Sequence, residues 1–279
     1  MQKLLAGGPL VWIARIGYVA RGIVFLIIGG FALMAAGGLG ADPQGARDAL
    51  ELIFQKRFGG IFLSALAAGL LCFASWRFRQ AIFDLNRHGN DWYGLTRRAV
   101  LAGSGAFYVA LAAAAVRITV EPRRVSEDQS AREWTAWVMS QPLGRALIAL
   151  IAAGFIGFAT GLAVKAVRAP YRQQHHATQT KRRWTAVALG SFGTLTRAVV
   201  FVMIGGYLAI AAYDANSRQA VSLAGVLRAM QQQAYGGVLL GIAALGLLAF
   251  GFFEITEAAA RRTAKLARQP SRAHPADLP

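Results

Sequence analysis

Six long stretches without a charged residue limit how this chain can fold. They cover residues 22–41, 58–76, 99–116, 146–164, 198–213 and 229–253. A helix needs roughly 20 apolar residues to cross the hydrocarbon core of a bilayer, which is about 30 Å thick. Four stretches fit outright, the fifth extends back to Leu195 with Arg197 near the membrane interface, and the sixth begins near Ala234. The sequence therefore predicts an all-α membrane protein with six transmembrane helices.

The positions of the positive charges predict how these helices are oriented. Of the 30 Lys and Arg residues, 20 lie in the two termini, the second loop and the fourth loop. The other three loops hold 10 of them, together with eight of the 13 acidic residues. Because loops rich in Lys and Arg stay in the cytoplasm, we expect both termini there. The net charge of +17 favours contact with anionic lipid headgroups. Nucleic acid is not an expected partner, because no basic stretch belongs to a recognisable reading module.

The chain also contains an internal repeat. At an offset of 176, Gly17, Arg21, Val24, Phe25, Ile28, Gly29 and Gly30 match Gly193, Arg197, Val200, Phe201, Ile204, Gly205 and Gly206. A weaker middle copy places Arg97, Gly105 and Phe107 at an offset of 76. The second helices align as well, with Gly69 and Phe73 matching Gly246 and Phe250, and Gly154 and Phe158 in the middle copy. The first span resembles a cleaved signal peptide, but its pattern recurs inside the chain.

Two-helix units that repeat keep the same orientation in the membrane. We therefore predict three parallel repeats related by a pseudo-threefold axis along the membrane normal, unlike the inverted repeats of many carriers. The expected organisation is an N-terminal cytoplasmic segment (1–11), repeats at 12–88, 89–177 and 178–262, and a cytoplasmic tail (263–279).

A short amphipathic segment precedes each second helix. Apolar residues recur at helical spacing in 46–54 and 220–227, and more briefly at Trp134, Trp137 and Val138. We predict helices lying on the outer membrane surface, with the tryptophans at headgroup level. Plain loops with chance spacing are the alternative.

Three sequence motifs resemble those of a known family. Arg21-Gly22-Ile23-Val24-Phe25 with Gly29, Asp42-Pro43-Gln44-Gly45-Ala46, and Gln141-Pro142-Leu143-Gly144 are similar to motifs of the bacterial membrane family catalogued as domain of unknown function 1206 (DUF1206). That family has a two-helix unit, typically in three copies, and the resemblance covers about residues 12–262. The middle copy departs from it, with Arg98 in place of the expected glycine. The resemblance implies a bacterial inner (plasma) membrane location and brings no known activity, substrate or catalytic residue.

Three repeated arginines are candidate contacts for an anion or a lipid headgroup. Arg21, Arg97 and Arg197 are expected to open the first helix of each repeat at the cytoplasmic face. A helix N-terminus and a guanidinium group together can bind phosphate or carboxylate. The alternative is that they are ordinary positive anchors. Arg77 and Glu254 align in the second helices and are candidates for ionic contacts near the interface, or they simply end their helices in headgroup water.

Small residues four apart suggest where helices pack. Gly157 and Gly161, Gly237 and Gly241, and Gly205 with Ala209 have this spacing, which lets helix backbones approach closely. The sequence contains no catalytic, cofactor-binding or metal-binding motif. His175 and His176 are adjacent but surrounded by positive charge, which is unfavourable for a metal. No ionisable residue is expected deep in a span, which counts against a proton-coupled carrier.

These observations predict a non-enzymatic membrane protein that organises lipid or a protein partner. The alternative is a channel or facilitator with a path along the pseudo-threefold axis. A membrane-embedded enzyme would need a cluster of polar groups that the sequence does not assemble.

Overall fold

The computed structural model describes residues 9–39, 42–55, 58–84, 89, 91–120, 126–174 and 181–266. Six of its helices are long and apolar enough to cross a membrane: α2 (Pro9–Ala36), α4 (Gly59–Ile82), α5 (Trp92–Val120), α7 (Gly144–Gln174), α8 (Lys181–Tyr213) and α10 (Gly236–Leu266). No strand occurs in these ranges. The prediction of an all-α chain with six spans is confirmed, and the six helices mark a multi-pass membrane protein.

The first helix of each repeat begins earlier than the charge-free stretches predict. Arg21 lies 12 residues after the start of α2, Arg197 lies 16 residues after the start of α8, and Arg97 lies five residues into α5. The expectation that these arginines open their helices is therefore wrong. The expectation that no ionisable residue lies deep in a span does not hold for two of them, because Arg21 and Arg197 each lie nine residues after the first residue of the apolar segments Trp12–Ala36 and Ala188–Tyr213. A charged residue ends a run of apolar residues in the sequence. It does not end the helix, because the backbone hydrogen bonds continue past it.

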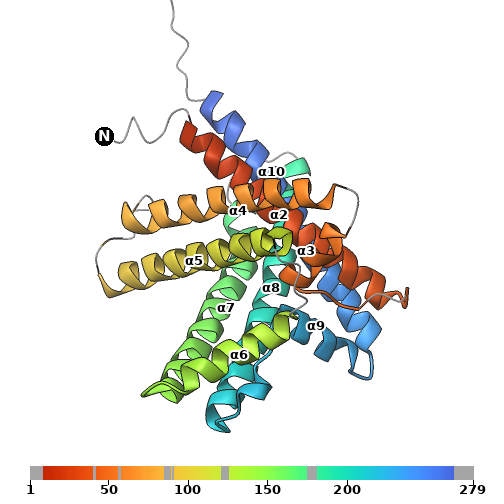
Figure 1. Cartoon of the computed structure of the whole chain (residues 1–279). Coiled ribbons are helices and arrows are strands. Elements are labelled where there is room, and N and C mark those ends of the chain that lie inside the picture. The colour runs from red at the N-terminus through yellow and green to blue at the C-terminus, as the bar shows by residue number, and fades with distance from the viewer. Residues whose placement is uncertain are drawn as a thin grey trace, which may run out of the picture.

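The most extensive helix contacts join successive repeats in a cycle. Helix α4 of the first repeat packs on α5 of the second, α7 of the second packs on α8 of the third, and α10 of the third packs on α2 of the first. Figure 1 shows these pairs crossing one another obliquely rather than running as a parallel bundle. This cyclic order is the one that a threefold arrangement of three repeats requires. The tightest units are pairs shared between neighbouring repeats, not the hairpins themselves.

Two repeats also close internally, through glycines at equivalent positions. A Cβ atom placed on Gly17 would lie 2.6 Å from the backbone nitrogen of Phe73, where α2 crosses α4. A Cβ atom placed on Gly193 would lie 2.6 Å from the backbone nitrogen of Phe250, where α8 crosses α10. Both separations are too short for a side chain, so backbone touches backbone at each crossing. The repeat in the sequence thus corresponds to a repeated helix contact.

The middle repeat lacks this contact. The register that places glycine at 17 and 193 places Tyr93 in α5, and Gly154 of α7 has open space where the matching glycine of the other repeats is packed. Across the described residues, α5 and α7 make at most marginal contact with each other. Their spans are the least buried of the six. The second repeat is therefore held by its neighbours rather than by its own hairpin.

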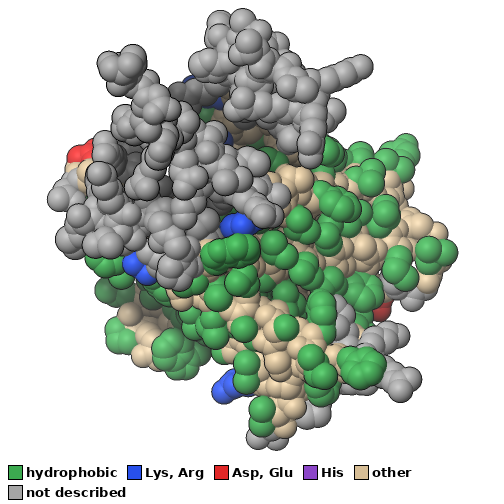
Figure 2. All heavy atoms as spheres, turned by 90° about the horizontal axis from the view of Figure 1, so that it is seen from above, with side chains coloured by type: hydrophobic (Ala, Val, Ile, Leu, Met, Phe, Trp, Pro, Cys, Tyr) green, Lys and Arg blue, Asp and Glu red, His purple; other side chains and the backbone are tan. Residues whose placement is uncertain are grey.

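Exposed apolar side chains cover the outer faces of these two helices. Phe107 of α5 and Leu150 of α7 are 57% and 69% exposed. Figure 2 shows that hydrophobic side chains dominate the described part of one face of the molecule, with few charged groups between them. Such a surface is stable only in contact with lipid or another apolar surface.

Three short helices join the spans at one end of the molecule. They are α3 (Ala46–Phe54), α6 (Glu127–Met139) and α9 (Leu223–Gln231), with a 3₁₀ turn, η1 (Ser217–Gln219), before the last. The predicted amphipathic helices are confirmed, and α3 has the predicted bounds. All three contact one another, so they form a cap at the end where α2, α5 and α8 finish. Trp134 and Trp137 of α6 are exposed, and their placement at headgroup level stays a prediction.

The predicted packing glycines divide into two groups. Gly205 of α8 lies against Ile156 of α7, with 2.8 Å between its placed Cβ and that side chain, and Gly237 and Gly241 of α10 lie beside Ala36 at the end of α2. By contrast, Gly157 and Gly161 have no atom within 4 Å of a placed Cβ. The predicted packing role is therefore wrong for these two within the described chain. Helix α8 packs on a different face of α7, which the spacing of small residues could not reveal.

Candidate functional site

A buried ion pair lies inside the bundle, between the first and third repeats. Arg21 of α2 and Glu254 of α10 are each 5% exposed, and Arg21 Nη1 donates to Glu254 Oε2 at 3.0 Å. Arg21 Nε donates to the hydroxyl oxygen of Tyr108, on α5, at 2.7 Å. Glu254, a predicted ionic position, therefore pairs with a residue of another repeat. The contact of Tyr108 with Arg21 was not predicted from the sequence. This contact brings all three repeats together at one guanidinium group.

Two glycines let α2 and α10 approach closely beside the ion pair of Arg21 and Glu254. A Cβ atom on Gly22 would lie 2.8 Å from the carbonyl oxygen of Gly251, and one on Gly251 would lie 2.9 Å from the carbonyl oxygen of Gly22. The backbones of α2 and α10 therefore touch one residue after Arg21 and three residues before Glu254. Because the helices are so close here, both side chains reach each other while remaining shielded from solvent.

Aromatic rings form the walls around the arginines. The Arg21 Cζ atom lies 5.0 Å from the ring centre of Phe73 and 4.9 Å from that of Phe250. The Arg197 Cζ atom, from α8, lies 4.3 Å from Phe250 and 5.1 Å from Phe25. The two guanidinium groups thus share a ring. Cation–π contacts of this kind contribute about 0.5–2 kcal/mol each, most when water is excluded.

Among the described residues, no carboxylate forms an ion pair with Arg197. It is 8% exposed, and its Nε is buried without a hydrogen-bond partner among the residues that the structure describes. The repeat register explains the difference, because the α7 position that corresponds to Glu254 is Leu162. Arg197 therefore has the same register position as Arg21, but no acid opposite it on α7.

Arg77 of α4 adds a third guanidinium group. Its Cζ atom lies 4.9 Å from the ring centre of Phe73, and its Nη1 donates to Gln80 Oε1 at 3.3 Å. Its Nε is buried with no partner in the described ranges. Three arginines and one glutamate give this arginine cluster (Arg21, Arg77, Arg197 and Glu254) a surplus of positive charge. An ionisable group inside a membrane span costs about 2.5–3.5 kcal/mol on the insertion scale and commonly marks a functional site.

The three predicted arginines do not form a ring. Arg21 and Arg197 converge on the same aromatic rings, whereas Arg97 is exposed on the surface of α5. Its neighbour Arg98 donates from Nε to the carbonyl oxygen of Ala81 at 2.7 Å, and so ties α5 to the end of α4. The residue that departs from the family pattern therefore has a structural role of its own. Contact of these arginines with lipid headgroups stays a prediction.

Between the arginine cluster and the cap, the interior is packed with apolar side chains. On α2, the residues after Arg21 that face inward are all buried, up to Ala35, a distance of about 21 Å along the helix. Buried side chains from three other spans surround them. The packed residues include Val24, Ile28, Ala32, Leu66, Leu70, Leu111 and Leu247. The described core therefore separates the arginine cluster from the opposite end of the bundle.

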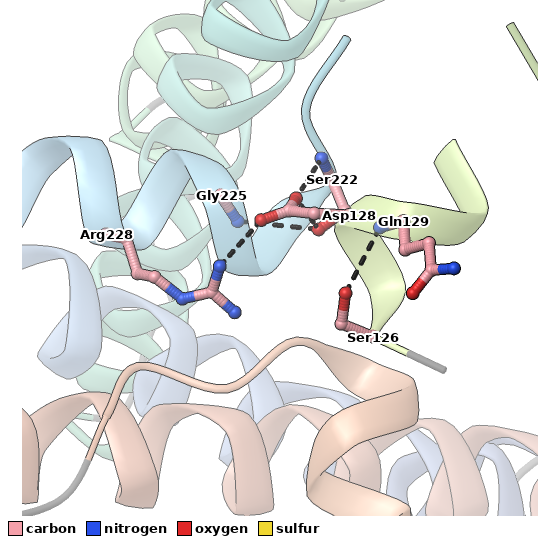
Figure 3. A network of polar contacts seen from close by, with 6 residues as sticks. All are labelled: Ser126, Asp128, Gln129, Ser222, Gly225 and Arg228. Atoms are coloured by element: carbon pink, nitrogen blue, oxygen red, sulfur yellow. Dashed lines mark hydrogen bonds and ion pairs between the residues drawn. The ribbon is translucent and has the colours of Figure 1, made fainter. Parts of the chain in front are cut away.

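A second polar network joins α6 to α9 within the cap (Figure 3). Asp128 Oδ1 accepts hydrogen bonds from the backbone N–H of Ser222 at 2.8 Å and from its hydroxyl at 2.6 Å. Arg228 Nη1 donates to Asp128 Oδ2 at 2.7 Å. Burial alone would raise the pKa of Asp128, but the Ser222 hydrogen bonds and the Arg228 charge together hold it below its usual value. The carboxylate is therefore ionised wherever the cap is intact near neutral pH.

This network predicts a pH dependence. Since the folded-state pKa of Asp128 is lowered, its contribution to stability is present above the unfolded-state value of about 4 and is lost as the pH falls through the folded-state value. Asp128→Asn should lower the thermal midpoint at pH 7 and flatten its decline below pH 4, measured by circular dichroism in detergent. The exposed Asp214→Asn is the matched control. An unchanged acid limb in Asp128→Asn would contradict this assignment.

Some sequence predictions lie outside the described residues. They are the adjacent histidines His175 and His176, most of the N-terminal segment 1–11, and most of the tail 263–279.

Comparison with known proteins identifies the family. The chain matches the family described as Domain of Unknown Function (DUF1206) three times, at residues 16–84, 99–169 and 192–261. It is similar to "Uncharacterized protein YxxB" of Bacillus subtilis (strain 168), with 32% identity over 243 residues that cover 86% of this chain and 87% of the relative. No solved structure matches. The three matches coincide with the three repeats, and the chain belongs to the DUF1206 family.

Proposed function

We propose that the protein is a non-enzymatic membrane protein that organises anionic lipid or a protein partner. The observation that carries this proposal is the combination of a positively charged cluster with a packed apolar core beyond it. Three arginines inside the bundle attract an anionic group, and about 21 Å of apolar side chains oppose its passage to the end where the cap lies. The arrangement supports binding from one side, the side that the distribution of Lys and Arg predicts to be cytoplasmic.

A channel or facilitator for small anions is the second candidate. It is favoured by a different observation, the buried Nε atoms of Arg77 and Arg197 that lack partners among the described residues. Donors of this kind inside a span occur along anion pathways as well as in closed sites. In that case the apolar core would have to open during transport.

A flux assay separates the two functions. The purified protein would be reconstituted into vesicles loaded with chloride or phosphate, and anion efflux would be compared with that of protein-free vesicles. We expect equal rates, because the packed core leaves no polar path in the described part of the bundle. Efflux that depends on the protein and falls in Arg197→Gln would instead establish the second candidate.

Lipid selection is measured on the same preparation. Native mass spectrometry of protein taken from vesicles with equal phosphatidylglycerol and phosphatidylcholine should detect retained phosphatidylglycerol in several-fold excess. Retention in proportion to the mixture would contradict lipid organisation and leave a protein partner as the remaining form of the proposal.

A further inference from the structure

Arg197 is a buried cation that forms no ion pair with any described residue. Glu254 accepts from Arg21 at 3.0 Å, and Arg21 also has the Tyr108 hydroxyl as an acceptor. The α7 position that corresponds to Glu254 is Leu162. Arg197 therefore has the repeat position of Arg21, but the facing helix lacks the acid that pairs with Arg21. A buried unpaired charge destabilises the folded state, and an anion bound beside it would offset that cost.

The unpartnered atoms indicate which kind of anion fits. Arg197 presents its Nε without an acceptor among the residues in the described ranges, and Arg77 does the same. Along one edge of a guanidinium group, Nε–H and a neighbouring Nη–H point the same way and match two oxygens of one oxyanion. Arg77 and Arg197 belong to one cluster of side chains, because Arg21 shares the ring of Phe73 with Arg77 and the ring of Phe250 with Arg197. An anion with several oxygens is suited to two such edges, whereas a halide offers a single acceptor atom.

The surroundings keep such an anion shielded from water. Rings of Phe25, Phe201 and Phe250 lie 5.1, 5.2 and 4.3 Å from Arg197 Cζ. Water-free surroundings strengthen hydrogen bonds between charged groups.

We propose that Arg197 and Arg77 form a binding site for a phosphate-type oxyanion inside the helix bundle. Arg21 is excluded from direct binding, because Glu254 and Tyr108 already occupy it, and its role is to hold α2, α5 and α10 together. The phosphate comes either from solution or from the headgroup of an anionic lipid. The site is compatible with both functions considered above, so its failure would not decide between them.

Binding is tested on delipidated protein in a maltoside detergent, which carries no phosphate. The thermal midpoint is followed while inorganic phosphate, or short-chain phosphatidylglycerol, is added at constant ionic strength set with chloride. We expect a saturable rise with at least one of the two ligands. A response to inorganic phosphate identifies a free-anion site, and a response to phosphatidylglycerol alone identifies a headgroup site. No saturable response to either ligand would overturn the proposal.

Variants assign the response to a residue. Arg197→Gln should weaken the apparent affinity at least tenfold, whereas Arg97→Gln, at the matching register position on the surface of α5, should leave it unchanged. If Arg197→Gln does not fold, Arg197→Lys retains the charge but lacks the Nε edge, and it should still bind several-fold more weakly. Equal affinity in the wild type and in the folded Arg197 variant would overturn the assignment.

Discussion

Replacing Glu254 by leucine is expected to destabilise the folded protein by about 3–5 kcal/mol. The change leaves the Arg21 guanidinium group, which is 5% exposed, beside an apolar side chain in place of its carboxylate. Removal of one partner from a buried ion pair costs this much because the other charge stays buried without compensation. Unfolding in mixed micelles, followed by circular dichroism as the fraction of denaturing detergent rises, measures the loss.

The double variant Arg21→Met, Glu254→Leu provides the control. With both charges removed, no uncompensated charge remains, and apolar replacement of a buried pair is often close to neutral. The double variant should recover at least half of the stability lost in Glu254→Leu, although the Tyr108 hydroxyl loses its donor. If the double variant is as unstable as the single one, the loss comes from packing at position 254 and not from the charge.

The second large effect is expected where backbones cross within a repeat. Gly17→Ala and Gly193→Ala each add one methyl group at 2.6 Å from a backbone nitrogen of the facing helix. Overpacking of a close contact costs about 1–3 kcal/mol, and here backbone rather than a flexible side chain would have to move. Both variants should lower the thermal midpoint by several degrees, whichever detergent is used.

Gly154→Ala is the matched control for these two variants. Gly154 has the same position in the second repeat as Gly69 and Gly246 have in the other two. The space around it is open, so an added methyl group meets no atom within 4 Å. All three changes remove a glycine from a helix and gain similar helix propensity, about 1 kcal/mol. A difference between them therefore measures the crossing alone. Equal thermal midpoints in the three variants would show that the added methyl group causes no steric strain at the helix crossings.

Much of this architecture could be predicted from the sequence, because membrane spans and repeats leave strong local patterns. The six helices, the three copies and the bounds of α3 all follow from apolar runs and spacing. The helix starts could not be predicted in this way. A window that ends at the first charge places Arg21 and Arg197 at the membrane interface, whereas the burial of these residues depends on rings and acids from other helices.

The arginine cluster was only partly predictable for the same reason. Arg21, Arg197, Arg77 and Glu254 were singled out by their register, but register does not tell which helix faces which. Tyr108 has no distinguishing spacing, and its role depends on α5 crossing near α2. The small-residue spacing failed at Gly157 and Gly161 because it identifies a face that can pack, while the position of α8 decides which face does.

The pairing of the first span with the last has a consequence for synthesis. Glu254 follows Arg21 by 233 residues, so at about 5–20 residues per second the ribosome needs roughly 10–50 s to supply the partner. During that time α2 is in the membrane with an arginine that later residues will neutralise. Insertion factors or lipid headgroups are therefore expected to accompany the nascent chain, and release should wait until the sixth helix arrives.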